Sequence, residues 1–134
     1  FLLNRSSDLL VEAVKYTPRR EYTLQLLAES WKLFTPQKMY EHYLQEGFKY
    51  YPYSTYFFPR LIDYYTTNGK NDEAMEYIDE AMEKDSLIQL FLLAKHSVLM
   101  SQKRYCEALK YGITLLRDNP DQAIPNYNVG YIYY

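Results

Sequence analysis

A 34-residue period runs through this 134-residue chain and constrains its fold more than any other feature. Three segments with helix-like apolar spacing end at Pro18, Pro52 and Pro120, and Ser86 completes the series. These four positions are evenly spaced, each one full period after the one before. A fixed period of this length indicates stacked copies of one supersecondary unit, because each copy buries its apolar face against its neighbours.

The residues between these marks predict two amphipathic helices of about a dozen residues in each period. Pro59 and Pro125 fit a helix only within its first turn, so the helices that contain them are expected to begin near 55–57 and 121–123. Gly69 is placed to end the preceding helix in a left-handed conformation. Three further start signals are Thr35-Pro36, a capping box of Ser86 with Gln89, and Asn71 as the cap of a helix from Asp72.

One segment carries the clearest likeness to a known family. Residues 71–86 have small residues at Ala74 and Ala81 with an apolar Ile78 between them, as in the second helix of a tetratricopeptide repeat (TPR). The chain therefore resembles the TPR family. The resemblance implies an all-α fold, an α-solenoid of antiparallel helix pairs that forms a right-handed superhelix, with the first helix of each repeat lining a concave groove.

The same frame divides the chain into a single TPR domain over 1–134. It contains a half repeat with a second helix (1–20), full repeats at 21–54, 55–88 and 89–122, and a further first helix at 123–134. Because the chain begins at Phe1 and ends within the apolar run that closes at Tyr134, we expect it to be a fragment of a longer TPR-containing protein.

Close helix crossings in this frame combine one small and one large residue, which conserves volume. The expected pairs are Ala28 with Tyr40, Ala74 with Ile62, and Ala108 with His96. The aromatic-rich segment 50–59 is expected to supply mostly core and inter-repeat contacts.

Composition excludes several functions. Lys and Arg number 15 against 17 Asp and Glu, a net charge of -2 that lacks the basic footprint of a nucleic-acid binder. A single cysteine excludes an intramolecular disulfide and a multi-thiolate zinc site. No apolar run reaches the roughly 18 residues of a membrane span. One cysteine fits a reducing cytoplasm and is also compatible with a bacterial periplasm or surface, so the compartment stays unknown.

No catalytic constellation is present in the sequence, and no cofactor is expected. A zinc-hydrolase His-Glu-x-x-His pattern and a Gly-x-Ser-x-Gly nucleophile turn are both lacking. We interpret His96 as a core histidine, His42 as part of a solvated helix face, and Cys106 as a packed small hydrophobe. The acidic side chains over 72–80 are interpreted as a solvated helix face. The sequence predicts a non-catalytic protein.

The expected groove defines the candidate binding residues. They are the side chains of successive first helices that the repeat frame turns toward it: Tyr22, Gln25, Glu29, Tyr56, Arg60, Asp63, Leu90, Leu93, Ser97, Tyr127 and Tyr131. Chaperone-binding TPR domains clamp a C-terminal carboxylate with Lys, Asn and Arg, and of these positions only Arg60 offers a charged donor. A carboxylate clamp is therefore not expected.

Three functions remain open at this point. The first is a scaffold or adaptor that binds a partner peptide or helix in the groove. The second is an architectural spacer, with self-association through exposed solenoid ends. The third is a carbohydrate-binding module that stacks sugars on tyrosine, of which the sequence has 17.

Overall fold

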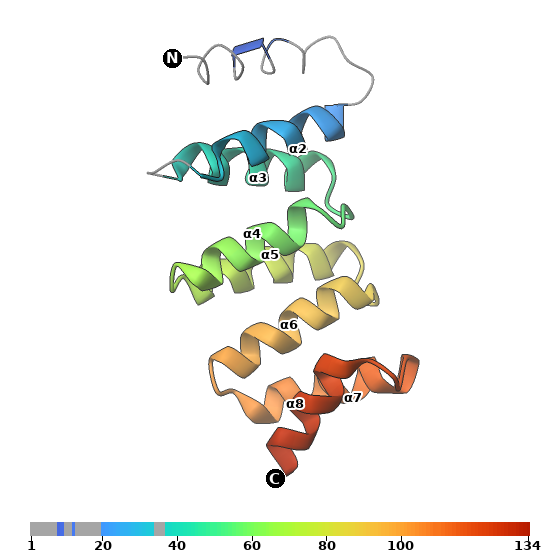
Figure 1. Cartoon of the computed structure of the whole chain (residues 1–134). Helices are drawn as coiled ribbons and strands as arrows, with labels where there is room; N and C mark the ends of the chain where they lie inside the picture. Colours follow the sequence, from blue (N-terminus) through green and yellow to red (C-terminus); the bar gives the residue numbers. More distant parts are fainter. Residues whose placement is uncertain (1–7, 10–11, 13–19, 34–36) are drawn as a thin grey trace. The chain divides into compact units, whose positions relative to one another are not determined.

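The computed structural model describes residues 8–9, 12, 20–33 and 37–134 (Figure 1). This part of the chain contains helices and no strand, so the predicted all-α class is confirmed. The helices are α2 (Arg20–Trp31), α3 (Lys38–Tyr50), α4 (Phe57–Thr67), α5 (Asn71–Lys84), α6 (Gln89–Ser101), α7 (Tyr105–Asp118) and α8 (Ala123–Tyr133). Three of the sequence features lie outside the described residues: Pro18, the Thr35-Pro36 signal and nearly all of the predicted half repeat. None of the described helices combines the length and apolarity that crossing a membrane requires.

The chain divides into two compact units, Phe1–Tyr64 and Tyr65–Tyr134, and the division falls within α4. In the first unit α2 packs against α3. In the second unit α6 packs against both α5 and α7, and α8 packs against α7 with a smaller contact to α6. Helices that are neighbours in the sequence are therefore neighbours in space within each unit.

The period of the sequence reappears in the helix ends. The second helices α3, α5 and α7 end at Tyr50, Lys84 and Asp118, which are one full period apart. The residue that follows each of these helices donates its backbone N–H to the carbonyl oxygen four residues earlier, as in the bond from Asp85 to Ala81 at 3.2 Å. The equivalent bonds run from Tyr51 to Gly47 and from Asn119 to Leu115. Each repeat thus closes its second helix in the same way.

Gly69 ends α4 as predicted. Its φ of 73° lies in the left-handed region, which glycine adopts without the clash of a Cβ. The N–H of Gly69 donates to the carbonyl oxygen of Thr66 at 3.1 Å, and the N–H of Lys70 donates to that of Tyr65 at 2.8 Å. These two bonds form a Schellman motif, which satisfies carbonyl groups at the end of the helix.

The same turn ends α6, but there a lysine occupies the left-handed position. Lys103 has a φ of 60° and stands one full period after Gly69. Its N–H donates to the carbonyl oxygen of Met100 at 3.0 Å, and the N–H of Arg104 donates to that of Leu99 at 2.9 Å. The sequence did not indicate this turn, because lysine rarely adopts the left-handed region.

Both predicted proline positions are confirmed. Pro59 is the third residue of α4 and Pro125 is the third residue of α8. At this position a backbone N–H has no partner within the helix, so proline costs no hydrogen bond.

The predicted capping box at Ser86 is wrong. Helix α6 begins at Gln89 with Ile88 as its N-cap, and no side chain caps it. The Asp85 carboxylate accepts a hydrogen bond from the N–H of Leu87 at 3.0 Å instead. Asp85 thereby holds a local turn over the residues in which the helix was expected to start.

The predicted cap at Asn71 is also wrong, by one residue. Asn71 is the first residue of α5, and Lys70 occupies the N-cap position without a side-chain capping bond. Arg104 occupies the same position before α7, one full period later. The last residue of each Schellman turn directly precedes the next helix, so this residue occupies the N-cap position.

Small residues allow close approach in the cores of both units. The members of the expected crossing pairs are all buried: Ala28 and Tyr40, Ala74 and Ile62, and Ala108 and His96. His96 is fully buried, and its Nδ1 lies 2.7 Å from the carbonyl oxygen of Ala108. A Cβ at Gly47 would collide with the ring of Phe57, so a glycine is required there.

The aromatic-rich segment 50–59 is divided between core and surface. Phe57 and Phe58 are fully buried, and Tyr51 stacks on Phe57 with ring centroids 6.4 Å apart. Tyr50 and Tyr53 are 44% and 55% exposed. The expectation of core packing therefore holds for the phenylalanines and not for these two tyrosines.

The interpretation of Cys106 as a packed residue is wrong, because its side chain is exposed. Helix α7 buries Ala108, Gly112 and Leu115. Cys106 precedes Ala108 by two positions, which turns it about 200° away from this face. His96 and His42 do lie as expected, the first buried and the second exposed.

Candidate functional site

All eleven candidate groove residues are at least partly accessible, and none is buried. The first unit carries six of them: Tyr22, Gln25 and Glu29 on α2, Tyr56 just before α4, and Arg60 and Asp63 on α4. The second unit carries five: Leu90, Leu93 and Ser97 on α6, and Tyr127 and Tyr131 on α8.

Three of these residues form what we call the Glu29–Tyr56–Arg60 cluster. The Tyr56 hydroxyl donates to Glu29 Oε1 at 2.6 Å, and Arg60 Nε lies 3.6 Å from the same oxygen. The Arg60 guanidinium lies over the Tyr56 ring, 3.9 Å from its centroid. The cluster therefore joins α2 to the start of α4 through one carboxylate, one phenol and one guanidinium.

Helix geometry brings the cluster together. Arg60 follows Tyr56 by four positions, which places both on one face as α4 begins, and its Nη1 donates to the Tyr56 carbonyl oxygen at 3.3 Å. Glu29 follows Gln25 by one turn on α2, and the Gln25 carbonyl oxygen lies 3.4 Å from the Tyr56 hydroxyl. The ring of Tyr56 is thus held from both helices.

The tyrosine hydroxyls in this region keep their protons. Burial, together with the hydrogen bond to Glu29, raises the pKa of Tyr56 well above its ordinary value of 10.0. Burial also raises the pKa of Tyr40, with smaller contributions from the charges of Glu29 and Asp63. Tyr56 consequently remains a hydrogen-bond donor to the Glu29 carboxylate at neutral pH.

The cluster is accessible to a partner. The Arg60 and Glu29 side chains are 38% and 45% exposed. An ion pair this exposed contributes about 0–1 kcal/mol to stability, so its effect is mainly to fix the direction of the guanidinium. A planar guanidinium held in a fixed orientation suits recognition of carboxylates and of carbonyl oxygens.

The other candidates of the first unit lie outside this cluster. Tyr22 is 58% exposed, and Asp63 is exposed on α4. Glu21, which is not among the candidates, accepts a hydrogen bond from the Ser54 hydroxyl at 2.8 Å. Glu21 also lines a shallow hollow of about 470 Å³, together with Tyr50, Tyr51, Pro52, Tyr53, Ser54 and Thr55.

The second unit presents its candidates on two helices. Leu90 and Leu93 are partly buried on α6, and Ser97 is exposed. Tyr127 is 73% exposed, and Tyr131 meets Tyr105 edge to face with ring centroids 6.0 Å apart. Binding by these residues, and self-association through α8, stay predictions.

Within the described ranges, no group of three or more His, Cys, Asp or Glu side chains could hold a metal ion. A second hollow, which contains none of the candidate residues, adjoins α5 and is lined by Tyr65, Glu73, Glu76, Tyr77 and Glu80. Its carboxylates are exposed, as expected of a solvated face over 72–80. The sequence signal for its α5 side is the spacing of Glu73, Tyr77 and Glu80, four and three positions apart, which places them on one helix face.

No protein-family model matches the chain, and no curated protein matches it. Among solved structures, the chain is similar to the crystal structure of a thermophilic TPR protein from Thermus thermophilus. The TM-score is 0.61 at 17% sequence identity, over 98% of this chain and 73% of that one. The chain therefore has the TPR fold, an all-α helical repeat.

Proposed function

We propose that this chain is a non-catalytic scaffold that binds a peptide or helix of another protein on the exposed face of its first helices. The Glu29–Tyr56–Arg60 cluster carries this proposal. It presents an oriented guanidinium and a tyrosine ring on an accessible surface. Arginine and tyrosine are among the residue types most enriched in protein-binding hot spots.

The partly exposed residues around the cluster and on the second unit support the same function. Tyr22 and Tyr127 offer large amphipathic side chains, and Leu90 and Leu93 offer apolar contact area. A TPR fold with such a surface suits helix or extended-segment recognition. Arg60 and Asp63 would set the orientation of the partner, while Tyr56, Tyr127 and Tyr131 would supply contact area.

Selection of binding peptides from a displayed random library tests the proposal. Affinity of the selected peptides is then measured by calorimetry against the wild type and against the double variant Tyr56→Ala/Arg60→Glu. We expect the double variant to bind at least about 30-fold more weakly, which corresponds to the roughly 2 kcal/mol that defines a hot spot.

A matched control makes the same kinds of change, loss of a tyrosine ring and reversal of a positive charge, at other surface positions. Tyr134→Ala/Lys110→Glu removes one exposed tyrosine and reverses one exposed cation outside the candidate set. Binding to this control should match the wild type. If both double variants bind the selected peptides equally well, the assignment to the Glu29–Tyr56–Arg60 face is wrong.

A further inference from the structure

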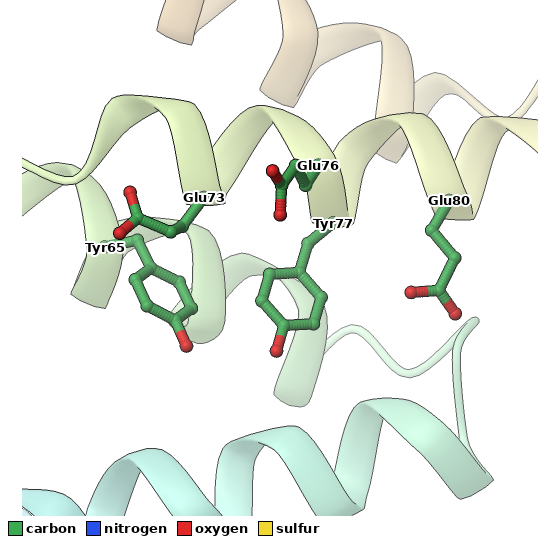
Figure 2. Close-up of a pocket in the computed structure, with 5 residues that line it drawn as sticks. All are labelled: Tyr65, Glu73, Glu76, Tyr77 and Glu80. Atoms are coloured by element: carbon green, nitrogen blue, oxygen red, sulfur yellow. The ribbon is translucent and has the colours of Figure 1, made fainter.

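A hollow of about 290 Å³ lies beside α5, and none of the candidate groove residues lines it (Figure 2). Tyr65 of α4 lines it together with Glu73, Glu76, Tyr77 and Glu80 of α5. All five belong to the unit Tyr65–Tyr134. Figure 2 shows both tyrosine rings on the same side of α5, with Glu73 next to Tyr65 and Glu80 beyond Tyr77.

The two tyrosines form an aromatic wall. Their rings stack with centroids 5.4 Å apart and an interplanar angle of 18°. Tyr65 is 4% exposed and Tyr77 is partly buried, so packing fixes the rings in place. The face of a tyrosine ring attracts cations, and Lys70 Nζ already lies 6.0 Å from the Tyr65 ring centroid.

Helix α5 concentrates negative charge around this wall. Its acidic residues are Asp72, Glu73, Glu76, Asp79, Glu80 and Glu83, against one basic residue, Lys84. The net charge of the whole chain is only -2, so α5 is far more acidic than the rest. Of the described residues, Lys84 pairs with Glu80 at 3.2 Å and Lys95 pairs with Asp79.

The glutamates of the hollow repel one another. Glu73 and Glu76 are three positions apart, and Glu76 and Glu80 are four apart, so they are neighbours on the helix surface. Like charges at these spacings destabilise a helix. A cation bound between them would relieve the repulsion, and this favours a positively charged ligand.

Among the described residues, arginine approaches tyrosine rings more closely than lysine does, since Lys49 and Lys70 lie 5.5 and 6.0 Å from the ring centroids of Tyr50 and Tyr65. The Arg60 guanidinium lies 3.9 Å from the Tyr56 ring centroid, and that of Arg20 lies 4.1 Å from the Tyr50 centroid. A guanidinium is planar, stacks on aromatic faces, and pairs with carboxylates through several N–H groups at once. We propose that the Tyr65–Tyr77 hollow binds an arginine side chain from an exposed segment of a partner protein.

Titration of the full chain with a capped Gly-Arg-Gly peptide, followed by NMR, tests this proposal. Backbone amide signals of residues 73–80 should shift in a saturable manner. The matched Gly-citrulline-Gly peptide, which has the same shape without the charge, should give no saturable shift. A Gly-Lys-Gly peptide should bind at least about threefold more weakly. An ammonium group is not planar, so it cannot stack flat on a tyrosine ring or donate two parallel hydrogen bonds to one carboxylate.

A matched pair of variants on the same helix separates the hollow from the general charge of α5. Glu76→Gln and Glu83→Gln each remove one exposed carboxylate, and only Glu76 lines the hollow. Glu76→Gln should raise the Kd about threefold to fivefold, the range expected for loss of one exposed charge pair, whereas Glu83→Gln should change it less than about twofold.

Three results would overturn the proposal. They are equal weakening by the two variants, equal binding of the arginine and citrulline peptides, and equal affinity for the lysine peptide. The Tyr56→Ala/Arg60→Glu variant leaves this hollow intact and should bind the arginine peptide as the wild type does. Failure here is therefore distinguishable from failure of the proposed groove function.

Discussion

Tyr56 has a hydroxyl group that resists ionisation, because it is partly buried and donates to Glu29. Its folded-state pKa lies above the unfolded value of 10.0. Below pH 10.0 the hydroxyl is protonated in both the folded and the unfolded state, so its contribution to the free energy of unfolding is fully present. As the pH rises above 10.0, the unfolded state loses its proton first, so the free energy of unfolding falls.

Replacement of this hydroxyl should change the pH dependence of stability. At pH 7, Tyr56→Phe should lower the free energy of unfolding by about 1 kcal/mol through loss of the hydrogen bond. Above about pH 10, the wild type should lose stability more steeply than the variant, so that their difference narrows. Urea titrations at several pH values measure this, with the exposed Tyr127→Phe as control. Parallel pH curves for wild type and Tyr56→Phe would contradict the account of this hydroxyl.

Lys103 and Gly69 occupy the same turn position with different residues. Lysine at positive φ is strained relative to glycine, so Lys103→Gly should raise the free energy of unfolding by about 0.5–1 kcal/mol. Gly69→Ala should lower it by about 1 kcal/mol. A Cβ at Gly69 meets nothing within 4 Å, so this cost comes from the backbone alone. Urea denaturation followed by circular dichroism measures both, and changes of the same sign would contradict the shared turn geometry.

At the scale of elements, the contact of α6, α7 and α8 depends on a glycine. A Cβ at Gly112 of α7 would lie 2.7 Å from Val129 Cγ2 and 2.9 Å from His96 Cε1. His96 also joins the three helices by hydrogen bonding, because its Nε2 lies 3.1 Å from Asn128 Nδ2 and its Nδ1 contacts Ala108. Close approach at Gly112 and this buried imidazole together hold α8 in place.

Two helical glycines give opposite expectations for the same substitution. Gly112→Ala should lower the free energy of unfolding by about 1–3 kcal/mol, because the added methyl group overpacks the crossing. Gly130→Ala should raise it by about 0.5–1 kcal/mol, because a Cβ there meets nothing within 4 Å and alanine favours helix. Thermal unfolding by calorimetry compares them. A Gly112→Ala variant as stable as Gly130→Ala would show that the crossing tolerates a larger residue.

For the molecule as a whole, the sequence predicted what depends on periodicity. The regular spacing of Pro18, Pro52, Ser86 and Pro120 indicated the all-α repeat. Pro59, Pro125 and Gly69 marked helix ends because their backbones restrict or release φ. Two turns escaped prediction. Asp85 competes with Ser86 for the turn before α6, and lysine at position 103 gives no signal of a left-handed turn.

The residues of the candidate site could be selected from the sequence, but the contacts among them could not. The repeat frame selected Glu29, Tyr56 and Arg60 as candidates for the groove, and their place in a groove stays a prediction. Their mutual contact joins α2 to α4 across the whole of α3, which local spacing cannot specify. The α5 hollow escaped because Tyr65 comes from a different helix than the glutamates, and an acidic helix face alone is most often solvated.

The recurrence of one turn at Gly69 and Lys103 bears on how such a chain can change length. Both turns use the same two backbone bonds, and the helices that follow begin at equivalent residues. An insert of one period, cut at these points, would meet matching backbone on both sides. Duplication or exchange of repeats at this turn therefore preserves both backbone bonds and the start of the next helix. The chain can in this way be lengthened or shortened by whole repeats.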